Sequence, residues 1–291
     1  MKHLVVFDLD GTLAASKSAM DNEMVNLLDS LLTFTKVAII SGGDWPQFEK
    51  QVLSRGLAPK GLPNLSLLPT CGTKFYTYGT DWEKLYSEDL TDNEKLRMVT
   101  EINSAIKSLG FIPKKTWGEV VEDRGSQITF SALGQDAPLQ KKKEWDPDFS
   151  KRKKMQEMLD KSIPEFSVRL GGTTSVDVTK AGIDKAYGIK KLVEILHVDK
   201  GEMMFMGDAI FPGGKSSYAI ANRMCDANLE KSTEWKVTGN GARKINPPVG
   251  ALRSPTRYAA FQSQVHLGHP WITAFISTAQ KTRRALVLRP R

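Results

Sequence analysis

The chain has 291 residues, of which 40% are hydrophobic and 25% are charged, a composition typical of a soluble globular protein. Its two cysteines, Cys71 and Cys225, lie far apart and outside any CxxC pair, which argues against a disulfide framework and favours a reducing compartment. The sequence shows no apolar run long enough to span a membrane and no signal-peptide pattern, so we expect a cytoplasmic protein with no membrane partner.

The net charge of +8 is concentrated near the C-terminal end of the chain. From Thr233 onward, ten basic residues accompany a single acidic one, Glu234, so the preceding residues are close to neutral. We interpret lysine-rich runs at 141–143 and 151–154 as a loop and as the solvated face of the following helix. Nucleic acid is therefore not an expected partner of the first 232 residues.

An apolar run at residues 5–7 predicts a buried strand, which delivers Asp8 and Asp10 into a turn at Gly11 and Thr12. Because the strand ends here, both carboxylates can converge on one pocket, where they need a neutralising cation. Hard oxygen ligands of this kind suit Mg²⁺, which also binds substrate phosphate. A carboxylate can attack phosphorus while a second acid transfers the proton, so we assign Asp8 to attack and Asp10 to proton transfer.

The pair of carboxylates alone also fits a surface turn or another enzyme's metal motif. A calcium-binding EF-hand loop fits poorly, because Thr12 and Ala19 stand where calcium ligands are required and a strand-like run, not a helix, precedes them. The assignment to phosphoryl transfer therefore depends on the motifs that follow.

The next segments predict a parallel sheet. Helical spacing of apolar residues at 20–32 separates the first strand from a second one at 36–40, which makes a βαβ unit. A further helix is expected to include Leu53 and to end near Gly56, and residues 66–78 predict strands around Gly72. The second strand ends in Ser41-Gly42-Gly43, whose hydroxyl and amides suit a phosphate at the carboxyl edge of the sheet.

An inserted domain is expected between Ser41 and Lys185, which more than 140 residues separate. Patterns at 96–106 and 155–159 predict helices, and those at 120–122, 128–132, 166–170 and 175–178 predict strands. Helices beside an antiparallel sheet would form an α+β cap. A cap that closes excludes water and presents side chains to the substrate.

Two later motifs complete a set. Residues 182–185 open a helical pattern that offers Lys185, and an apolar run at 202–206 ends in Gly207-Asp208. The ordered set resembles the four motifs of the haloacid dehalogenase (HAD) phosphohydrolase superfamily. The set's members in chain order are Asp8 with Asp10, then Ser41, Lys185 and Asp208. The resemblance implies an α/β fold, with a Rossmann-like core built on a parallel sheet and an inserted α+β cap.

Three segments, 171–177, 180–189 and 205–214, are similar to eukaryotic-type phosphomannomutases and their prokaryotic phosphatase-like relatives, and the similarity covers roughly residues 1–220. It implies that Mg²⁺ is held by Asp8, the backbone carbonyl of Asp10, and Asp208. It also places Ser41 and Lys185 on the phosphoryl oxygens, and the candidate substrate-binding residues are Gly11, Thr12, Gly42, Arg124, Ser175 and Asp177.

The cap distinguishes a mutase from a phosphatase, because the phosphomannomutases grip the distal phosphate of a bisphosphorylated sugar with several arginines. Arg124 matches one of these positions, whereas Lys17, Trp117 and Gln135 stand at others. We therefore prefer a Mg²⁺-dependent phosphatase acting on a phosphosugar or other small phosphomonoester. The alternative is a phosphomannomutase that interconverts mannose 1-phosphate and mannose 6-phosphate, and a homodimer through the cap is a candidate assembly.

A third hypothesis is a catalytically impaired binding protein, because Lys215-Ser216 follow Gly214 where an Asn-Asp pair is usual in the family. We divide the chain into a first core part at 1–82, the cap at 83–182, a second core part at 183–232 and a basic tail at 233–291. The family pattern fades from about residue 215, and the tail's composition opposes compact folding. A changed reading frame is the leading hypothesis, and a true basic tail that binds nucleic acid or an anionic surface is the alternative.

Overall fold

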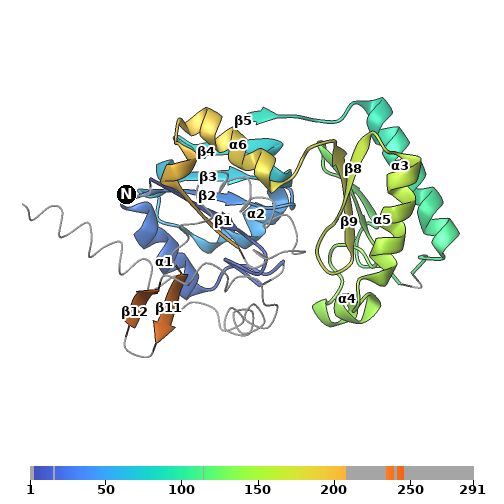
Figure 1. Cartoon of the computed structure of the whole chain (residues 1–291), viewed down its shortest axis with the longest axis horizontal. Coiled ribbons are helices and arrows are strands. Elements are labelled where there is room, and N and C mark those ends of the chain that lie inside the picture. The colour runs from blue at the N-terminus through green and yellow to red at the C-terminus, as the bar shows by residue number, and fades with distance from the viewer. Residues whose placement is uncertain (1–2, 16, 114, 208–233, 239–240, 246–291) are drawn as a thin grey trace, which may run out of the picture.

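The computed structural model describes residues 3–15, 17–113, 115–207, 234–238 and 241–245. Two sheets, each covered by helices, lie side by side (Figure 1). A six-stranded sheet forms the core, and a four-stranded antiparallel sheet forms the cap. The architecture agrees with the predicted α/β core that carries an α+β cap.

The core sheet has the order β10-β1-β2-β3-β4-β5. Its first four strands in that order pair in parallel, and β4 pairs antiparallel with both β3 and β5. Their bounds are β1 (Leu4–Asp8), β2 (Lys36–Ile40), β3 (Leu65–Leu68), β4 (Lys74–Tyr78), β5 (Trp82–Ser87) and β10 (Met203–Met206). The strands predicted from the apolar runs before Asp8, Ser41 and Gly207 are therefore confirmed.

Successive side chains of β1 point to opposite faces of the sheet, and each face is covered by a helix. Val5 and Phe7 pack in one apolar cluster with α1 (Asn22–Leu32), whereas Leu4 and Val6 pack in another with α6 (Lys185–Leu196). Every β1 residue is buried, as expected for a parallel strand covered on both faces. Asp21 caps α1, because its carboxylate accepts a hydrogen bond of 2.9 Å from the Met24 amide.

The helix after Ser41 is shorter than predicted. Helix α2 (Trp45–Gln51) ends before Leu53, and the chain continues as a 3₁₀ turn at Leu53–Arg55. Gly56 closes that turn with φ of 71°, a left-handed conformation that glycine adopts without strain. The predicted helix therefore exists, but its last residues belong to the tighter turn.

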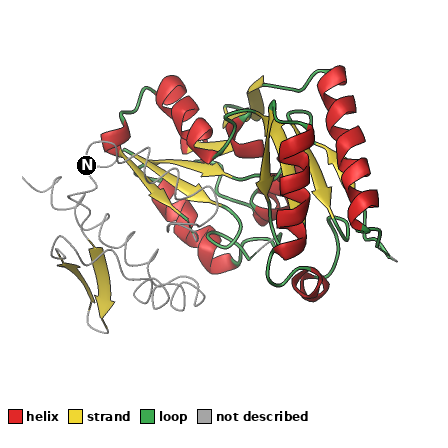
Figure 2. Cartoon of the chain, turned by 45° about the vertical axis from the view of Figure 1, so that its right-hand side comes forward, coloured by secondary structure: helices red, strands yellow, loops and turns green. Residues whose placement is uncertain are grey.

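The cap sheet has the order β6-β7-β9-β8, with β6 (Val121–Asp123), β7 (Gln127–Ser131), β8 (Phe166–Leu170) and β9 (Ser175–Lys180). Helices α3 (Asp92–Leu109) and α5 (Ser150–Ser162) cover one face of this sheet (Figure 2). Phe130 of β7 and Val176 of β9 pack with them in the cap's apolar core. The alternate residues, among them Thr129 and Asp177, bear polar side chains on the opposite face.

The lysine-rich runs differ from their predicted form. Residues 141–143 belong to a helix, α4 (Leu139–Trp145), where a loop was expected. Lys142 in α4 and Arg152 in α5 are buried, so neither run is only a solvated face. Counting charges along the sequence cannot reveal which cation of a run turns inward, and here the buried ones find acceptors inside the cap.

Strand β5 extends the core sheet past residue 82, where the sequence placed a domain boundary, and the division into domains stays a prediction. In the basic tail, β11 (Glu234–Thr238) and β12 (Gly241–Ile245) pair as an antiparallel hairpin. The segment at 215–233, where the family pattern fades, lies outside the described residues. Among the residues that are described, no helix combines the length and the apolar character needed to cross a membrane.

Candidate phosphoryl-transfer site

Asp8 and Lys185 form a buried ion pair at the carboxyl edge of the core sheet. Asp8 is the last residue of β1 and is 5% exposed, and its Oδ1 accepts a hydrogen bond of 2.7 Å from the Leu9 amide. Lys185, the first residue of α6, directs its Nζ to the Asp8 Oδ2. Asp184 caps α6 by accepting from the Tyr187 amide at 3.0 Å, which fixes where the helix and its lysine begin.

Ser41 lies beside this pair. β1 and β2 are in parallel register with Asp8 opposite Ile40, so Ser41 follows directly at the same edge. Ser41 is buried, and its hydroxyl accepts a hydrogen bond of 3.1 Å from the Gly43 amide. The structure therefore brings together Asp8, Ser41 and Lys185, which the sequence placed in three separate motifs.

Thr12 adds an unsatisfied hydroxyl at the turn after β1. Its Oγ1 is shielded from solvent and finds no hydrogen-bond partner among the described residues. A buried polar group without a partner costs about 1–3 kcal/mol. Gly11 permits the turn, because its φ of 83° is open to glycine. A ligand oxygen, such as one of a phosphoryl group, would satisfy the Thr12 hydroxyl.

Asp10 is held by donors that the sequence analysis missed. Its Oδ1 accepts hydrogen bonds from the Lys17 amide at 2.8 Å and from Gln51 Nε2 at 3.1 Å. Its Oδ2 accepts from Gln47 Nε2 at 2.9 Å. Gln47 and Gln51 lie one turn apart on α2, and that spacing on the helix after Ser41 is the signal that could have revealed them. The three donors fix the orientation of the Asp10 carboxylate.

The polar face of the cap sheet contacts the loop at Ser41-Gly42-Gly43 in the core. The Gly42 carbonyl accepts hydrogen bonds from Arg124 Nη1 at 3.0 Å and from Gln127 Nε2 at 3.2 Å. Arg124 also forms an ion pair with Glu122, with its Nε and Nη2 at 2.9 and 2.6 Å from the carboxylate. The Asp177 carboxylate faces the α-carbon of Gly42 and accepts from Thr129 Oγ1 at 2.8 Å.

A group of cations lies where the cap meets the core. Lys17 Nζ contacts Gln135 Oε1, so two of the predicted arginine-equivalent positions do come together. Burial, followed by the nearby charges of Arg124 and Lys142, lowers the pKa of Lys17 to about 8. The Gln135 Nε2 is buried and has no partner within the described part of the chain. An anion bound here would relieve the repulsion between the cations and satisfy Gln135.

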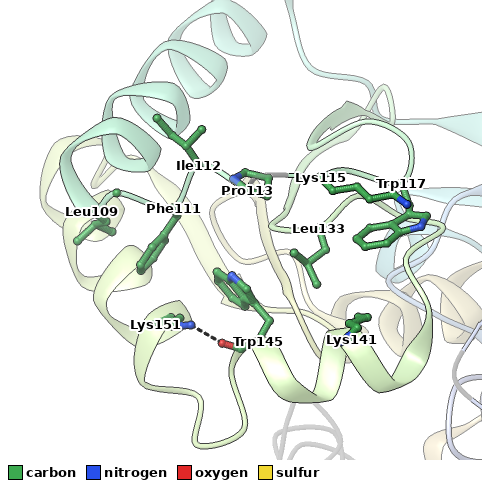
Figure 3. A pocket seen from close by; sticks show the side chains of 11 residues that line it. Leu109, Phe111, Ile112, Pro113, Lys115, Trp117, Leu133, Lys141, Trp145 and Lys151 are labelled. Atoms are coloured by element: carbon green, nitrogen blue, oxygen red, sulfur yellow. Dashed lines mark hydrogen bonds between the residues drawn. The ribbon is translucent and has the colours of Figure 1, made fainter.

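Trp117, the third such position, does not join this group. Its side chain lines a separate cap pocket of about 550 Å³ together with Phe111 and Trp145 (Figure 3). Lys151 donates a hydrogen bond of 2.6 Å to the Trp145 carbonyl at the edge of this pocket. The pocket is formed entirely by cap residues, and Asp8, Ser41 and Lys185 do not line it.

Cys71 borders the site without taking part in its chemistry. Its amide donates to the Ser41 carbonyl at 2.8 Å. Desolvation raises the pKa of the Cys71 thiol to about 12, so it stays protonated near neutral pH. A protonated thiol is a poor nucleophile and a poor metal ligand.

The candidate metal ligands are described in part. β10 pairs with β1 so that Met206 lies opposite Phe7, and Asp208, two residues beyond β10, falls outside the described residues. The described residues contain no cluster of three or more acidic, histidine or cysteine side chains that could hold a metal by themselves. The buried Asp8 carboxylate at this edge nevertheless has the oxygen chemistry that Mg²⁺ prefers.

This arrangement of fold and site defines a phosphoryl-transfer enzyme of the HAD superfamily. The model of the family described as eukaryotic phosphomannomutase matches residues 24–227, and the chain belongs to that family. Phosphomannomutase 2 of Dictyostelium discoideum is 28% identical over 75% of this chain and 86% of its own length. The phosphomannomutase of Spinacia oleracea is 26% identical over 79% of this chain and 91% of its own length.

A solved structure of the N-terminal truncated IMP-nucleotidase of Plasmodium falciparum shares the fold. It superposes with a TM-score of 0.52 at 15% identity, and the match covers 75% of this chain and 63% of the nucleotidase. The likeness concerns the fold alone. The names of the sequence relatives favour the phosphomannomutase alternative over the phosphatase that the sequence analysis preferred.

Proposed function

We propose that this chain transfers the phosphoryl group of a phosphosugar through Asp8. The observation that carries the proposal is the buried carboxylate of Asp8, paired with Lys185 and placed next to Ser41. Attack by a carboxylate oxygen on phosphorus would form an aspartyl-phosphate and release the sugar oxygen. Lys185 and the Ser41 hydroxyl would balance the charge that develops on the phosphoryl oxygens.

Asp10 is suited to proton transfer in this reaction. Its carboxyl group would donate a proton to the departing sugar oxygen and take one from the hydroxyl that attacks the aspartyl-phosphate next. The amides of Gln47 and Gln51 would keep this group oriented in both steps. A mutase returns the phosphoryl group to a second hydroxyl of a sugar, whereas a phosphatase gives it to water.

The mutase is the better supported reaction. Its bisphosphorylated intermediate needs a second anion site, and the group of Lys17, Arg124 and Gln135 offers cationic and amide donors where the cap meets the core. The relatives named phosphomannomutase support a hexose phosphate as the substrate. We therefore propose the interconversion of mannose 1-phosphate and mannose 6-phosphate.

A phosphatase is the second candidate because of Arg124. All three nitrogens of its guanidinium are already engaged, two by Glu122 and one by the Gly42 carbonyl. A distal phosphate would have to share this guanidinium with both acceptors, because these three bonds leave two of its five N–H groups for a further ligand. A small phosphomonoester without a distal phosphate would not need the Arg124 guanidinium as a ligand.

Mg²⁺ is the proposed cofactor. Asp8, the backbone carbonyl of Asp10, and Asp208 would hold it, a set of hard oxygen ligands. When bound, the ion would neutralise charge between Asp8 and the substrate phosphate. Removal of Mg²⁺ by a chelator should stop turnover, and added Mg²⁺ should restore it.

The reactions can be separated by ³¹P NMR with mannose 1-phosphate, Mg²⁺ and a hexose bisphosphate activator. Appearance of mannose 6-phosphate supports the mutase, and release of inorganic phosphate without interconversion supports the phosphatase. An Asp8→Asn variant is the control for contaminating enzymes, because it keeps the shape of the side chain and removes the nucleophile. Absence of both products from the folded wild-type protein would refute phosphoryl transfer and favour a binding protein.

A further inference from the structure

Arg152 is a buried cation that contacts the loop beside Ser175 and Asp177, two candidate substrate-binding residues of the cap. It is 1% exposed, although its neighbours in the sequence include three lysines. Its Nε lies 2.7 Å from Asp146 Oδ2, and its guanidinium carbon lies over the ring of Phe149, 4.8 Å from the centroid. Asp146 also accepts from the backbone amides of Lys151 and Arg152, so the pair is built into the start of α5.

The other end of the Arg152 guanidinium holds a loop. Its Nη1 donates to the Gly172 carbonyl and lies 3.5 Å from the Gly171 carbonyl. These glycines begin the turn between β8 and β9, and Gly171 donates from its amide to the Ser175 carbonyl at 2.8 Å. Arg152 therefore reaches from the helical layer of the cap to the backbone beside two candidate substrate residues.

The loop lies directly against those residues. A Cβ atom added at Gly171 would come within 2.8 Å of the Asp177 carboxylate and 2.9 Å of the Ser175 Cβ. A displacement of this backbone would therefore displace both side chains or open a gap beside them. Glycine is required here because the backbone approaches them so closely.

We propose that Arg152, held by Asp146, is a positioning residue that fixes the loop at Gly171 and Gly172 and so sets the enzyme's discrimination for the non-reacting end of its substrate. The inference rests on the proposed phosphosugar function. Arg152 acts through the loop and touches no substrate itself. A misplacement of about 1 Å at a substrate-positioning group can cost roughly 100-fold in rate.

The test variant is the pair Asp146→Asn with Arg152→Met. It leaves no unpaired charge, because both ionised groups are removed together. The asparagine keeps an oxygen that can accept from the start of α5. The matched control is Arg97→Met, which removes an arginine that also binds a carboxylate, of Glu165 at 2.7 Å, and a backbone carbonyl, but on the exposed side of the cap.

Two measurements follow. Amide hydrogen exchange at residues 171–175 should rise in the double variant and stay at the wild-type rate in Arg97→Met. The kcat/KM for a hexose phosphate should fall by about 10- to 100-fold, while the kcat/KM for p-nitrophenyl phosphate stays within about twofold. Arg152→Lys should recover part of the hexose phosphate activity, because it keeps a cation beside Asp146.

The outcomes separate the inference from the function on which it rests. Unchanged amide hydrogen exchange at residues 171–175 in the double variant refutes the proposal that Arg152 fixes this loop, whatever the activity. Faster amide exchange together with an equal loss of kcat/KM on both substrates refutes the role of Arg152 in substrate discrimination. Arg152 then has only a structural role. A folded wild-type protein that turns over neither substrate refutes the proposed function and, with it, the role in substrate discrimination. The amide exchange at residues 171–175 still tests whether Arg152 fixes the loop.

Discussion

Replacing Lys17 tests whether the cations between cap and core bind an anion of the substrate. Burial and the charges of Arg124 and Lys142 lower the pKa of Lys17 to about 8. Lys17 therefore changes from mostly charged to mostly neutral as the pH rises through about 8. Arginine stays charged at every accessible pH, so Lys17→Arg keeps the cation and removes the titration.

The magnitude follows from the protonated fraction. With a pKa of about 8, this fraction falls about tenfold between pH 7 and pH 9. The kcat/KM for a hexose phosphate should fall by the same factor in the wild-type protein, because kcat/KM reports the free enzyme. The profile of p-nitrophenyl phosphate, which has no distal group to reach Lys17, should lack this decline.

Steady-state rates from about pH 6.5 to about pH 9.5 at constant ionic strength provide the assay. Lys17→Arg should flatten the hexose phosphate profile above pH 8, and Lys50→Arg, at an exposed position on α2, should leave it as in the wild type. A decline that is identical for both substrates, or that survives in Lys17→Arg, would refute a role for the Lys17 charge in binding.

The remaining predictions concern stability and the support of the site. Because the pKa of Lys17 is lower in the folded protein than its ordinary value of 10.5, the unfolded chain binds more protons between pH 8 and pH 10.5. The free energy of unfolding should therefore gain a favourable contribution, at most roughly 3 kcal/mol, as the pH rises through that window. Urea unfolding of Lys17→Met should lack it, and an unchanged pH dependence would contradict the burial of this charge. Asp8→Asn should abolish turnover in initial-rate assays, because an amide cannot serve as the attacking oxyanion, and wild-type rates in the folded variant would contradict the assignment. Gln51→Leu should lower kcat by roughly 10- to 100-fold, because a hydrogen bond to a charged group contributes about 1.5–3 kcal/mol, and a change below about twofold would argue against orientation by this amide. Gly188→Ala should lower the free energy of urea unfolding by about 1–3 kcal/mol, because its new methyl group would overlap Ile40. Gly201→Ala is its control, since no described atom lies within 4 Å of a Cβ there, and equal stabilities of the two variants would oppose the packing argument.

The fold could be predicted where burial of a strand or helix requires a recognisable pattern of apolar residues. β1 and β2 are covered on both faces, so they appear as continuous apolar runs, and the residues that follow them have to lie at one edge of the sheet. The order of the chain alone therefore predicts that Asp8 and Ser41 are neighbours. Lys185 follows from the helix that begins at its position.

The parts that sequence reasoning missed are polar side chains whose partners lie far along the chain. Gln51 is fully buried in α2 because Asp10 and the Ser18 carbonyl accept its amide, and neither contact leaves a periodic signal. Arg152 looked like one more surface cation within a basic run. Its burial depends on Asp146 and on a loop about twenty residues away, which only the folded cap brings together.

In the proposed reaction, Arg124 would link substrate binding to the contact between cap and core. Its Nη1 reaches the Gly42 carbonyl, so the residue best suited to grip a distal phosphate also joins the cap to the loop that would hold the reacting one. A phosphate that draws Arg124 away from this carbonyl leaves only Gln127 to donate to it in the described structure. Displacement of this carbonyl by a distal phosphate would therefore weaken one attachment of the cap. Such release would suit a mutase, because its bisphosphorylated intermediate must present first one phosphoryl group and then the other to the same aspartate.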